Sequence, residues 1–221
     1  MQNPINLDTR LSLCADFVRV GAKLADVGTD HAYLPVHLAL SGKIASAIAA
    51  DINIEPLSRG KQTIDKYDVS HLVSTRLSDG LKAFDSDEVT DIVIAGMGAD
   101  TIISIISNAL WLKDNSKRLI LQPMTKSERV ITYLYDNGFE IQDQKCCIAE
   151  GKPYTVLCVR YTGHSSPCTE YFSYTGKLSP EQYAEDKKFL EKQVSILTKR
   201  SAANEDFGKL SNKIKERLDN I

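Results

Sequence analysis

The sequence has no long hydrophobic run, few cysteines and no glycine-rich phosphate loop. No stretch approaches about 18 consecutive apolar residues, so the sequence predicts no transmembrane helix. The five cysteines are odd in number and contain no C-x-x-C pair, which disfavours a disulfide framework and a zinc site. The first residues lack a basic segment followed by an apolar core, so no signal peptide is expected. These absences predict a cytoplasmic protein with no metal and no membrane partner.

Charge is nearly balanced in this chain. The 27 Lys and Arg residues stand against 29 Asp and Glu residues, giving a net charge of −2. The whole molecule therefore has no overall attraction for nucleic acid, and any nucleic-acid surface must be a local basic patch. With 43% hydrophobic and 25% charged residues, the 221 residues suffice for one α/β domain plus an appendage.

Short apolar runs alternate with longer periodic segments from about residue 23 to residue 162. This alternation predicts an α/β fold, a doubly wound, Rossmann-like parallel sheet. Two consecutive strands joined by the turn "GKP" close the series and predict an antiparallel ribbon at one edge. Pro123 is expected to end its strand. The predicted strands are 23–28, 44–51, 72–77, 91–98, 117–123, 139–150 and 154–162, and the predicted helices are 32–42, 54–67, 99–111 and 126–138.

Composition changes after residue 163. Residues 164–180 read as a linker that ends in a helix start at Ser179-Pro180. Two apolar stripes at helical spacing then predict an α-helical coiled-coil hairpin. The sequence therefore divides into a sheet domain, 1–163, and a linker with helical hairpin, 164–221. The stripes are Tyr183, Leu190, Val194 and Leu197, followed by Phe207, Leu210, Ile214 and Leu218.

Polar residues and glycines gather where the predicted parallel strands end. In a doubly wound sheet, ligands bind beyond these carboxyl ends. Short turns also favour Gly, Asp and Asn, so purely structural turns are the alternative. The residues at the strand ends are Gly28, Thr29, Asp30 and His31; Asp51 and Ile52; Asp79 and Gly80; Gly96, Met97 and Gly98; and Gln122.

The first and second strand ends indicate which ligand binds. A carboxylate at Asp51 can accept hydrogen bonds from the ribose diol of an adenosine, and Gly28 lets the backbone approach a ligand. The G-x-G-x-x-G pattern is absent, however, because Asp30 and Tyr33 occupy its later glycine positions. Since a carboxylate there would repel a pyrophosphate, NAD and flavin dinucleotides are disfavoured. An adenosine without phosphates fits, and S-adenosyl-L-methionine, whose cationic groups suit Asp26 and Asp30, is the expected cofactor.

Several stretches also resemble a known family. "ADVGTDHAYLP" (25–35), "SDGL" (78–81), "IAGMGA" (94–99) and "LILQP" (119–123) resemble the TrmK family of bacterial tRNA (adenine-22, N1)-methyltransferases. The resemblance implies a class I methyltransferase that uses S-adenosyl-L-methionine, methylates N1 of an adenine in tRNA and carries a C-terminal coiled-coil hairpin. This chain departs from many family members in having Met124, not Asn, after Gln-Pro.

The resemblance also implies roles for individual residues. The loop of Gly28 and Thr29 would hold the methionine part of the cofactor, and Arg10 would lean toward its carboxylate or toward an RNA phosphate. An exposed helix-start arginine is the alternative for Arg10. Gln122 would lie on the substrate side of the site. Asp51 would hold the ribose, Ile52 the adenine face, Asp79 and Gly80 the adenine edge, and Gly96, Met97 and Gly98 would face the reacting methyl group.

The chemistry of adenine N1 requires little from the protein beyond placement. Its lone pair attacks the methyl group directly, so the reactants must be aligned, and the positive charge that appears on the base needs an acidic neighbour. Proton loss from the exocyclic amine can follow, helped by a general base. Asp30 and His31 are the predicted catalytic residues for these roles, with Tyr33 as a stacking wall. A helix N-cap is the alternative for Asp30, and a turn histidine for His31. The fourth strand ends without the Asp/Asn-Pro-Pro-aromatic pattern of amine methylases, which favours a ring nitrogen.

An adenine within folded tRNA must be unstacked, and phosphate contacts must compensate for that cost. Lys126 and Arg129 are predicted to contact the substrate, and the hairpin is predicted to hold tRNA. A monomer or weak dimer is expected. Two alternatives stay open: a small-molecule methyltransferase, and a cofactor-binding partner protein that dimerises through the hairpin. The basic hairpin residues are Lys187, Lys188, Lys192, Lys199 and Arg200.

Overall fold

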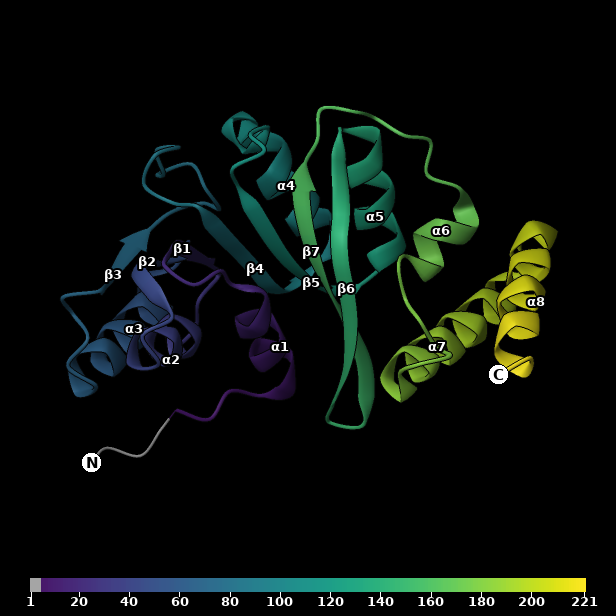
Figure 1. The fold of residues 1–221 in the computed structure, drawn as a ribbon, viewed down its shortest axis with the longest axis horizontal. Coiled ribbons are helices and arrows are strands. Elements are labelled where there is room, and N and C mark those ends of the chain that lie inside the picture. The colour runs from purple at the N-terminus through teal and green to yellow at the C-terminus, as the bar shows by residue number, and fades with distance from the viewer. Residues whose placement is uncertain (1–4) are drawn as a thin grey trace.

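The computed structural model describes residues 5–221 and contains a seven-stranded sheet with the order β3-β2-β1-β4-β5-β7-β6 (Figure 1). Strands β1 to β5 are parallel, and β7 is antiparallel to both of its neighbours. The direction of winding reverses between β1 and β4, which makes their carboxyl ends the topological switch point of the sheet. The strands are β1 (Ala22–Val27), β2 (Ile44–Asp51), β3 (Val73–Leu77), β4 (Asp91–Gly98), β5 (Arg118–Thr125), β6 (Phe139–Ala149) and β7 (Lys152–Tyr161).

Helices cover both faces of the sheet. Apolar side chains of α1, α2 and α3 form one core with the sheet, and those of α4 and α5 form a second core on the opposite face (Figure 1). This three-layer arrangement buries β1 and β4 on both faces, which explains their nearly continuous apolar sequences. The helices are α1 (Thr9–Phe17), α2 (Tyr33–Leu40), α3 (Ile54–Lys66), α4 (Ala99–Asn108), η1 (Leu110–Leu112), α5 (Ser127–Asp136), α6 (Glu170–Thr175), α7 (Ala184–Arg200) and α8 (Glu205–Asp219).

The predicted α/β fold is confirmed, with β2 and β4 at their predicted bounds, and two predictions about the later strands are wrong. Strand β5 continues through Pro123 to Thr125. The pairing register between β4 and β5 shifts beside Gly96, so the sheet does not need the backbone N–H that Pro123 lacks. The turn of the β6–β7 hairpin is Glu150-Gly151, whose φ angles of 49° and 72° suit a two-residue turn. Lys152 and Pro153 therefore belong to β7.

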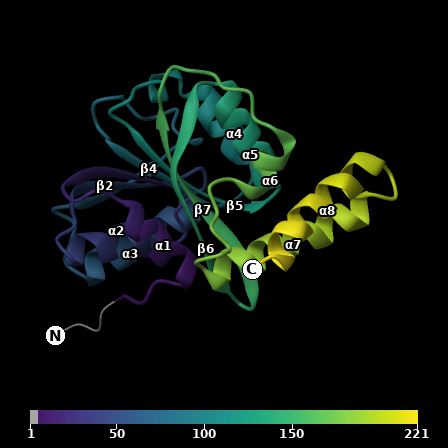
Figure 2. The same cartoon turned by 45° about the vertical axis from the view of Figure 1, so that its right-hand side comes forward.

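Helices α7 and α8 pack against each other and project from the sheet domain (Figure 2). Their shared core contains Leu190, Leu197, Leu210, Ile214 and Leu218, as the predicted stripes require. The prediction for Tyr183 is wrong, because this residue precedes α7 and is 53% exposed. Helix α6 lies inside the stretch expected to be a linker, where Thr169 caps it by accepting from the backbone N–H of Phe172 at 3.2 Å. Among residues 5–221, no helix combines the length and apolar character needed to cross a membrane.

Candidate active site

The carboxyl edge, meaning the ends of β1 to β5 and the residues directly after them, brings the predicted strand-end residues together. Gly28 follows β1 with φ of +80°, and its N–H donates to the carbonyl of Ala50 at 2.8 Å. A Cβ at Gly28 would lie 2.1 Å from Cε of Met97, at the end of the neighbouring β4. The φ angle of +80° favours glycine at this position, and a side chain here would also require the flexible end of Met97 to move.

A buried carboxylate lies beneath this loop. Asp26 is 7% exposed, and burial raises its pKa to about 6, with the hydrogen bond from the Thr29 side chain opposing the rise. Oγ1 of Thr29 also accepts from the N–H of Ala32 at 3.1 Å, and Ala32, with φ of 54°, is the N-cap residue of α2. Thr29 therefore supplies the side-chain contact at this helix start, and the alternative of Asp30 as N-cap is wrong.

Asp30, His31 and Tyr33 lie together after β1. Oδ2 of Asp30 lies 3.3 Å from Nε2 of His31, and the His31 and Tyr33 rings stack at 4.9 Å between centroids and 8° between planes. Oδ1 of Asp30 accepts from Nε of Arg59 at 3.1 Å and also from Nη2. This ion pair raises the pKa of Arg59, chiefly through the hydrogen bond to Asp30. Sequence reasoning missed Arg59, because its i,i+4 pairing with Glu55 is typical of any exposed helix face.

The ends of β2 and β3 provide one polar and two apolar surfaces. Asp51 is half-buried, and its Oδ1 accepts from the N–H of Asn53 at 2.7 Å. Ile52 and Leu77 are 59% and 54% exposed, although both are large apolar residues. Because Leu77 pairs with Asp51 in the sheet, the carboxylate and the apolar surfaces adjoin. A ribose with its attached adenine requires this combination of acceptor and apolar contact.

The next loop, after β3, holds Asp79 and Gly80. The Asp79 carboxylate pairs with Nζ of Lys82 at 2.5 Å and is exposed. Gly80 has φ of +60°, and a Cβ there would lie 2.9 Å from Cγ1 of Ile105 on α4. The loop is therefore closely packed against α4 while the Asp79 carboxylate stays at the surface.

The Gln122 side chain fixes the backbone of Gly96 through a hydrogen bond. The N–H of Gly96 donates to Oε1 of Gln122 at 3.0 Å, and Gly96 has φ of +76°. Gln122 is 1% exposed, and its amide nitrogen donates to the carbonyl of Pro123 at 3.1 Å. Gly98 follows as the N-cap residue of α4. Gln122, predicted to contact the substrate, thus has its polar atoms engaged inside the protein, where they shape the Gly96 loop.

Arg10 lies at the start of α1, next to the end of β5. Its Nη2 pairs with Asp8 at 2.8 Å, and its Nη1 lies 3.2 Å from Sδ of Met124. The guanidinium also lies 5.4 Å from the centre of the Tyr154 ring. Nε of Arg10 is buried without a hydrogen-bond partner within the described part of the chain. Arg10 is therefore part of the carboxyl edge, on its β5 side, and part of its donor capacity is unused.

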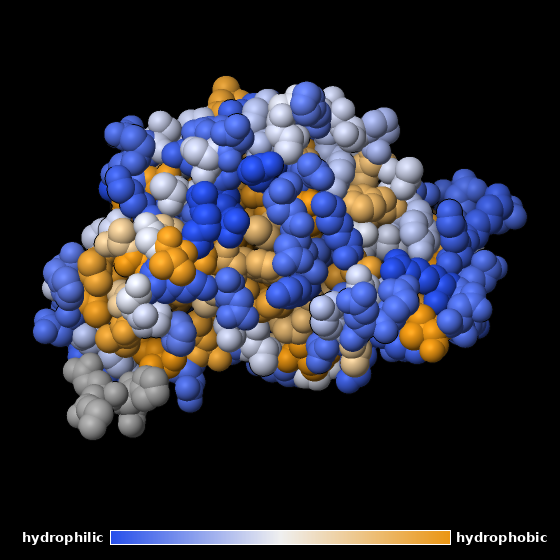
Figure 3. Space-filling view, in the orientation of Figure 1, coloured by the Kyte–Doolittle hydropathy of each residue, from blue (hydrophilic) through white to orange (hydrophobic). Residues whose placement is uncertain are grey.

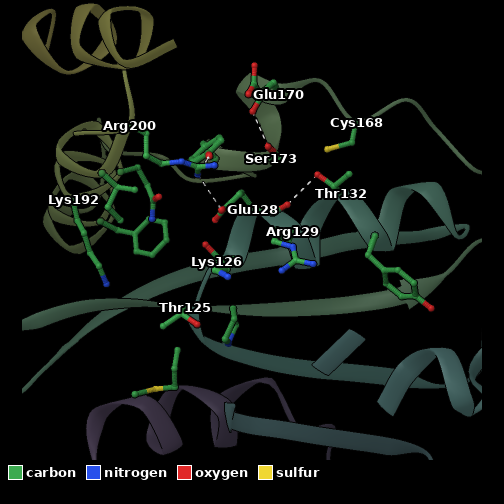
Figure 4. A pocket seen from close by; sticks show the side chains of 18 of the residues that line it. Thr125, Lys126, Glu128, Arg129, Thr132, Cys168, Glu170, Ser173, Lys192 and Arg200 are labelled. Atoms are coloured by element: carbon green, nitrogen blue, oxygen red, sulfur yellow. Dashed lines mark hydrogen bonds and ion pairs between the residues drawn. The ribbon is translucent and has the colours of Figure 1, made fainter. Parts of the chain in front are cut away.

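A cleft of about 1200 Å³ lies between the end of β5, α5, α6 and α7 (Figure 4). Lys126, Arg129, Lys192 and Arg200 all line it, whereas the predicted hairpin contacts Lys187, Lys188 and Lys199 do not. The wall is also aromatic, with Tyr133, Tyr154, Tyr174, Phe189 and Phe207 among its residues.

Some of the cleft cations are paired with acidic side chains. Arg129 binds Asp100 at 2.6 Å. Arg200 lies 3.6 Å from Glu128 and donates to the Tyr174 hydroxyl at 2.7 Å. Because Met97 and Gly98 pair with Pro123 and Thr125, the cleft begins beside the Gly96 loop.

The residues of the carboxyl edge fit S-adenosyl-L-methionine. The Gly28 loop has no side chain at its turn, Asp51 offers an acceptor beside the exposed Ile52, and buried Asp26 suits a nearby cation. A phosphate-bearing dinucleotide fits poorly because Asp30 stands where its binding loop needs glycine. Within residues 5–221, no three His, Cys, Asp or Glu side chains are close enough to hold a metal ion.

Comparison with known proteins identifies the family. A model described as a methyltransferase domain matches residues 7–157. A candidate tRNA (m1A22) methyltransferase of Streptococcus pneumoniae, solved with S-adenosyl-L-methionine, is 32% identical; the match covers 96% of this chain and 100% of the other, with a TM-score of 0.86. The crystal structure of Bacillus subtilis TrmK, an m1A22 tRNA methyltransferase, is 29% identical, with 97% of each chain covered and a TM-score of 0.77. The chain belongs to the TrmK family of methyltransferases.

A curated relative agrees with this assignment. The tRNA (adenine(22)-N(1))-methyltransferase of Bacillus subtilis (strain 168) is 34% identical over 155 residues. That alignment covers 70% of this chain and spans 65% of the length of the relative. The predicted family and the predicted enzyme class, a methyltransferase, are confirmed. Since the solved structures match at least 96% of this chain, the similarity extends through the helical hairpin as well as the sheet domain.

Proposed function

We propose that this chain transfers a methyl group from S-adenosyl-L-methionine to N1 of adenine 22 in tRNA. The observation that carries the proposal is that two surfaces adjoin: an edge suited to an adenosine without phosphates lies next to a basic and aromatic cleft, at the paired ends of β4 and β5. Base stacking on aromatic side chains and phosphate contacts with cations are how proteins bind unpaired RNA. The relationship to TrmK proteins supports the same reaction.

The cofactor lies along the carboxyl edge, and when bound it supplies an electrophilic methyl group on a sulfonium sulfur. Gly28 and Thr29 hold its methionine part above the Asp26 carboxylate. Asp51 accepts from the ribose hydroxyls, and Ile52 packs on the adenine face. Asp79 and Gly80 border the adenine edge. Gly96, Met97 and Gly98 face the methyl group, with Gln122 fixing the backbone of Gly96.

The target adenine enters between the Gly96 loop and the Asp30-His31 loop. N1 needs no base to remove a proton before it attacks, so alignment is the principal contribution of the protein. Positive charge develops on the adenine, where Asp30 and His31 stabilise it. Tyr33 forms one wall of the base site, and the exposed 44% of this residue is available for stacking.

The cleft holds the tRNA backbone. Lys126 is exposed beside the end of β5, and Arg129, Lys192 and Arg200 continue the basic lining toward the hairpin (Figure 4). Arg10 contacts a phosphate or the cofactor carboxylate from the opposite side. We assign the chemistry to residues 1–163 and tRNA holding to residues 164–221, whose α7–α8 pair acts as a coiled-coil hairpin. Since the substrate is tRNA, the enzyme works in the cytoplasm.

The enzyme acts as a monomer. The apolar stripes of α7 and α8 are buried against each other and against Tyr174 and Leu178 of the same chain. On the face seen in Figure 3, the surface over the two helices is largely hydrophilic. A hairpin that satisfies its apolar face internally has little left to bury against a second copy.

The reaction is tested with labelled S-adenosyl-L-methionine and a tRNA transcript that carries adenine at position 22. We expect labelled 1-methyladenosine after digestion, and none from a matched transcript with guanine at that position. Asp30→Ala and Asp51→Ala variants should lose most of the transfer. Equal labelling of both transcripts would overturn the assignment of position 22. Cofactor binding by calorimetry without any transfer to tRNA would overturn the proposed substrate.

A further inference from the structure

Helix α3 approaches the loop after β1 closely. Gly60 packs against Ala32, and a Cβ on Gly60 would lie 3.3 Å from the Cβ of Ala32. The preceding residue, Arg59, extends from this contact point to Asp30, where both Nε and Nη2 donate to Oδ1. Its Nη1 donates to Oε1 of Glu55 at 2.9 Å. The guanidinium is therefore held by two carboxylates and cannot turn without breaking contacts to one of them.

The second oxygen of Asp30 faces His31. Oδ2 lies 3.3 Å from Nε2 of the imidazole, and the stack on Tyr33 fixes the plane of the same ring. His31 is thus oriented at its edge by a carboxylate and on its face by an aromatic ring. A carboxylate that orients an imidazole in this way also selects which ring nitrogen carries the proton.

We propose that Arg59 is a positioning residue for methyl transfer and acts through Asp30 on His31. By occupying Oδ1, Arg59 leaves Asp30 with Oδ2 directed at Nε2 of His31. The nearby carboxylate favours the proton on Nε2, the ring nitrogen that faces it, so Nδ1 keeps its lone pair. This lone pair accepts a hydrogen bond from the exocyclic amine of the target adenine. The assignment of that amine rests on the proposed function, whereas the orientation of His31 by Arg59 and Asp30 does not.

The arrangement suits the charge that develops during the reaction. As adenine N1 takes the methyl group, the electron pair of the broken carbon–sulfur bond stays on sulfur and the base becomes cationic. The amine N–H is then a stronger donor, so its hydrogen bond to His31 strengthens in the transition state. No proton leaves the base in this step. Asp30, balanced by Arg59, orients the imidazole and is not the proton acceptor.

The orientation is tested without any substrate, by nuclear magnetic resonance of the histidine side-chain nitrogens. The chain has four histidines, and a His31→Gln variant assigns the signals of His31. We expect the Nε2–H tautomer at His31 in the unaltered protein and a mixture of tautomers in Arg59→Gln. Lys61→Gln, which removes an exposed cation from the same helix, should leave the His31 signals unchanged. Identical His31 signals in Arg59→Gln and the unaltered protein, or the Nδ1–H tautomer in the latter, would overturn the proposal.

Kinetics test the consequence for catalysis. We expect Arg59→Gln to lower kcat on tRNA about 10-fold with KM changed less than about twofold, as for other residues that orient a catalytic group. Arg59→Lys, which keeps the charge but not the two-donor contact, should recover part of the loss. If Arg59→Gln instead raises KM and keeps the same kcat as Lys61→Gln, Arg59 contacts a phosphate of the tRNA. That result would overturn the proposal. If the unaltered enzyme fails to methylate adenine 22, the proposed function falls, while the tautomer measurement still decides the role of Arg59.

Discussion

The neighbouring strands β1 and β4 each contain a buried aspartate, and the two aspartates differ in whether a cation of the protein pairs with them. At the amino end of β4, Asp91 is fully buried and accepts from the N–H and Nε of Arg19 at 2.9 and 2.8 Å. Arg19 in turn donates to the carbonyls of Thr90 and Ser116, both at 2.9 Å. At this amino edge, Asp91 and Arg19 are thus paired with each other, and Arg19 also with backbone carbonyls, so these contacts serve stability.

At the carboxyl end of β1, Asp26 is also buried, but no cation pairs with it within residues 5–221. The Thr29 side chain contacts it, and the adjoining Gly28 has the left-handed backbone, with φ of +80°, that favours glycine. An unpaired buried carboxylate costs stability, and such costs gather at functional sites. The comparison teaches that Asp91 obtains its cation from the protein, whereas Asp26 is left for a cationic ligand to pair with.

The largest effect should come from breaking the amino edge. Asp91→Ala removes the buried partner of Arg19 and should lower the free energy of unfolding by about 4 kcal/mol. Cofactor affinity of the folded protein should stay within about twofold of the unaltered protein, because the carboxyl edge is untouched. Urea unfolding and calorimetry measure the two quantities. A cofactor affinity reduced 10-fold at unchanged stability would contradict this division between the edges.

The opposite change is expected from Asp26→Asn, which removes the unpaired buried charge. Because burial raises the pKa of Asp26 from 3.8 to about 6, the folded state binds the proton more tightly than the unfolded state. Proton binding by Asp26 therefore stabilises the folded state. This contribution is fully present below pH 3.8 and is lost as pH rises through about 6. At pH 8 the variant should therefore be more stable by about 3 kcal/mol, with the gain shrinking toward pH 5.

Asp26→Asn should bind the cofactor about 10-fold more weakly despite its greater stability, because it has lost the charge that faces the cationic methionine part. Denaturant unfolding between pH 5 and 8, with calorimetry at pH 8, measures both effects. A stability difference that is constant with pH would show that ionisation of Asp26 is not its source.

A smaller effect is expected at the end of β2. Asp51→Ala should weaken cofactor binding about 30-fold, because it removes a charged acceptor of the ribose hydroxyls. Stability should change little, since within residues 5–221 the half-buried carboxylate accepts a hydrogen bond only from the backbone N–H of nearby Asn53. Asp65→Ala, an exposed acid on α3, is the matched control for charge. Equal affinities of the two variants for S-adenosyl-L-methionine would remove Asp51 from the cofactor site.

The smallest effect compares lysines at the two edges. Lys126→Ala, at the cleft, should weaken tRNA binding about threefold and reduce the salt dependence of binding by about one phosphate contact. Lys113→Ala, an exposed lysine after η1, should change neither. Filter binding at several salt concentrations measures both. If the two variants behave alike, the cleft is not the path of the RNA backbone.

Strand positions were predictable because the buried central strands are continuous apolar runs between turn residues. Helix α6 was not, since six residues rich in Tyr, Ser and Thr give no periodic signal and the helix depends on packing, as of Tyr174 in the hairpin core. Tyr183 continued the apolar stripe in the sequence, but it precedes α7 and stays exposed, because a stripe is buried only where a partner covers it.

The sequence by itself determined the succession of strands and helices along the chain, except α6, together with the identity of the strand-end residues and the lack of a phosphate loop, because these depend on neighbours along the chain. Only the tertiary structure decided what each side chain contacts. In the folded chain, the Gln122 side chain points inward and bonds Gly96, and Arg59 contacts Asp30, 29 residues away in the sequence. Helices α5 and α7 line the same cleft. Such contacts depend on how helices and strands pack in space, which the local pattern of residue types does not specify.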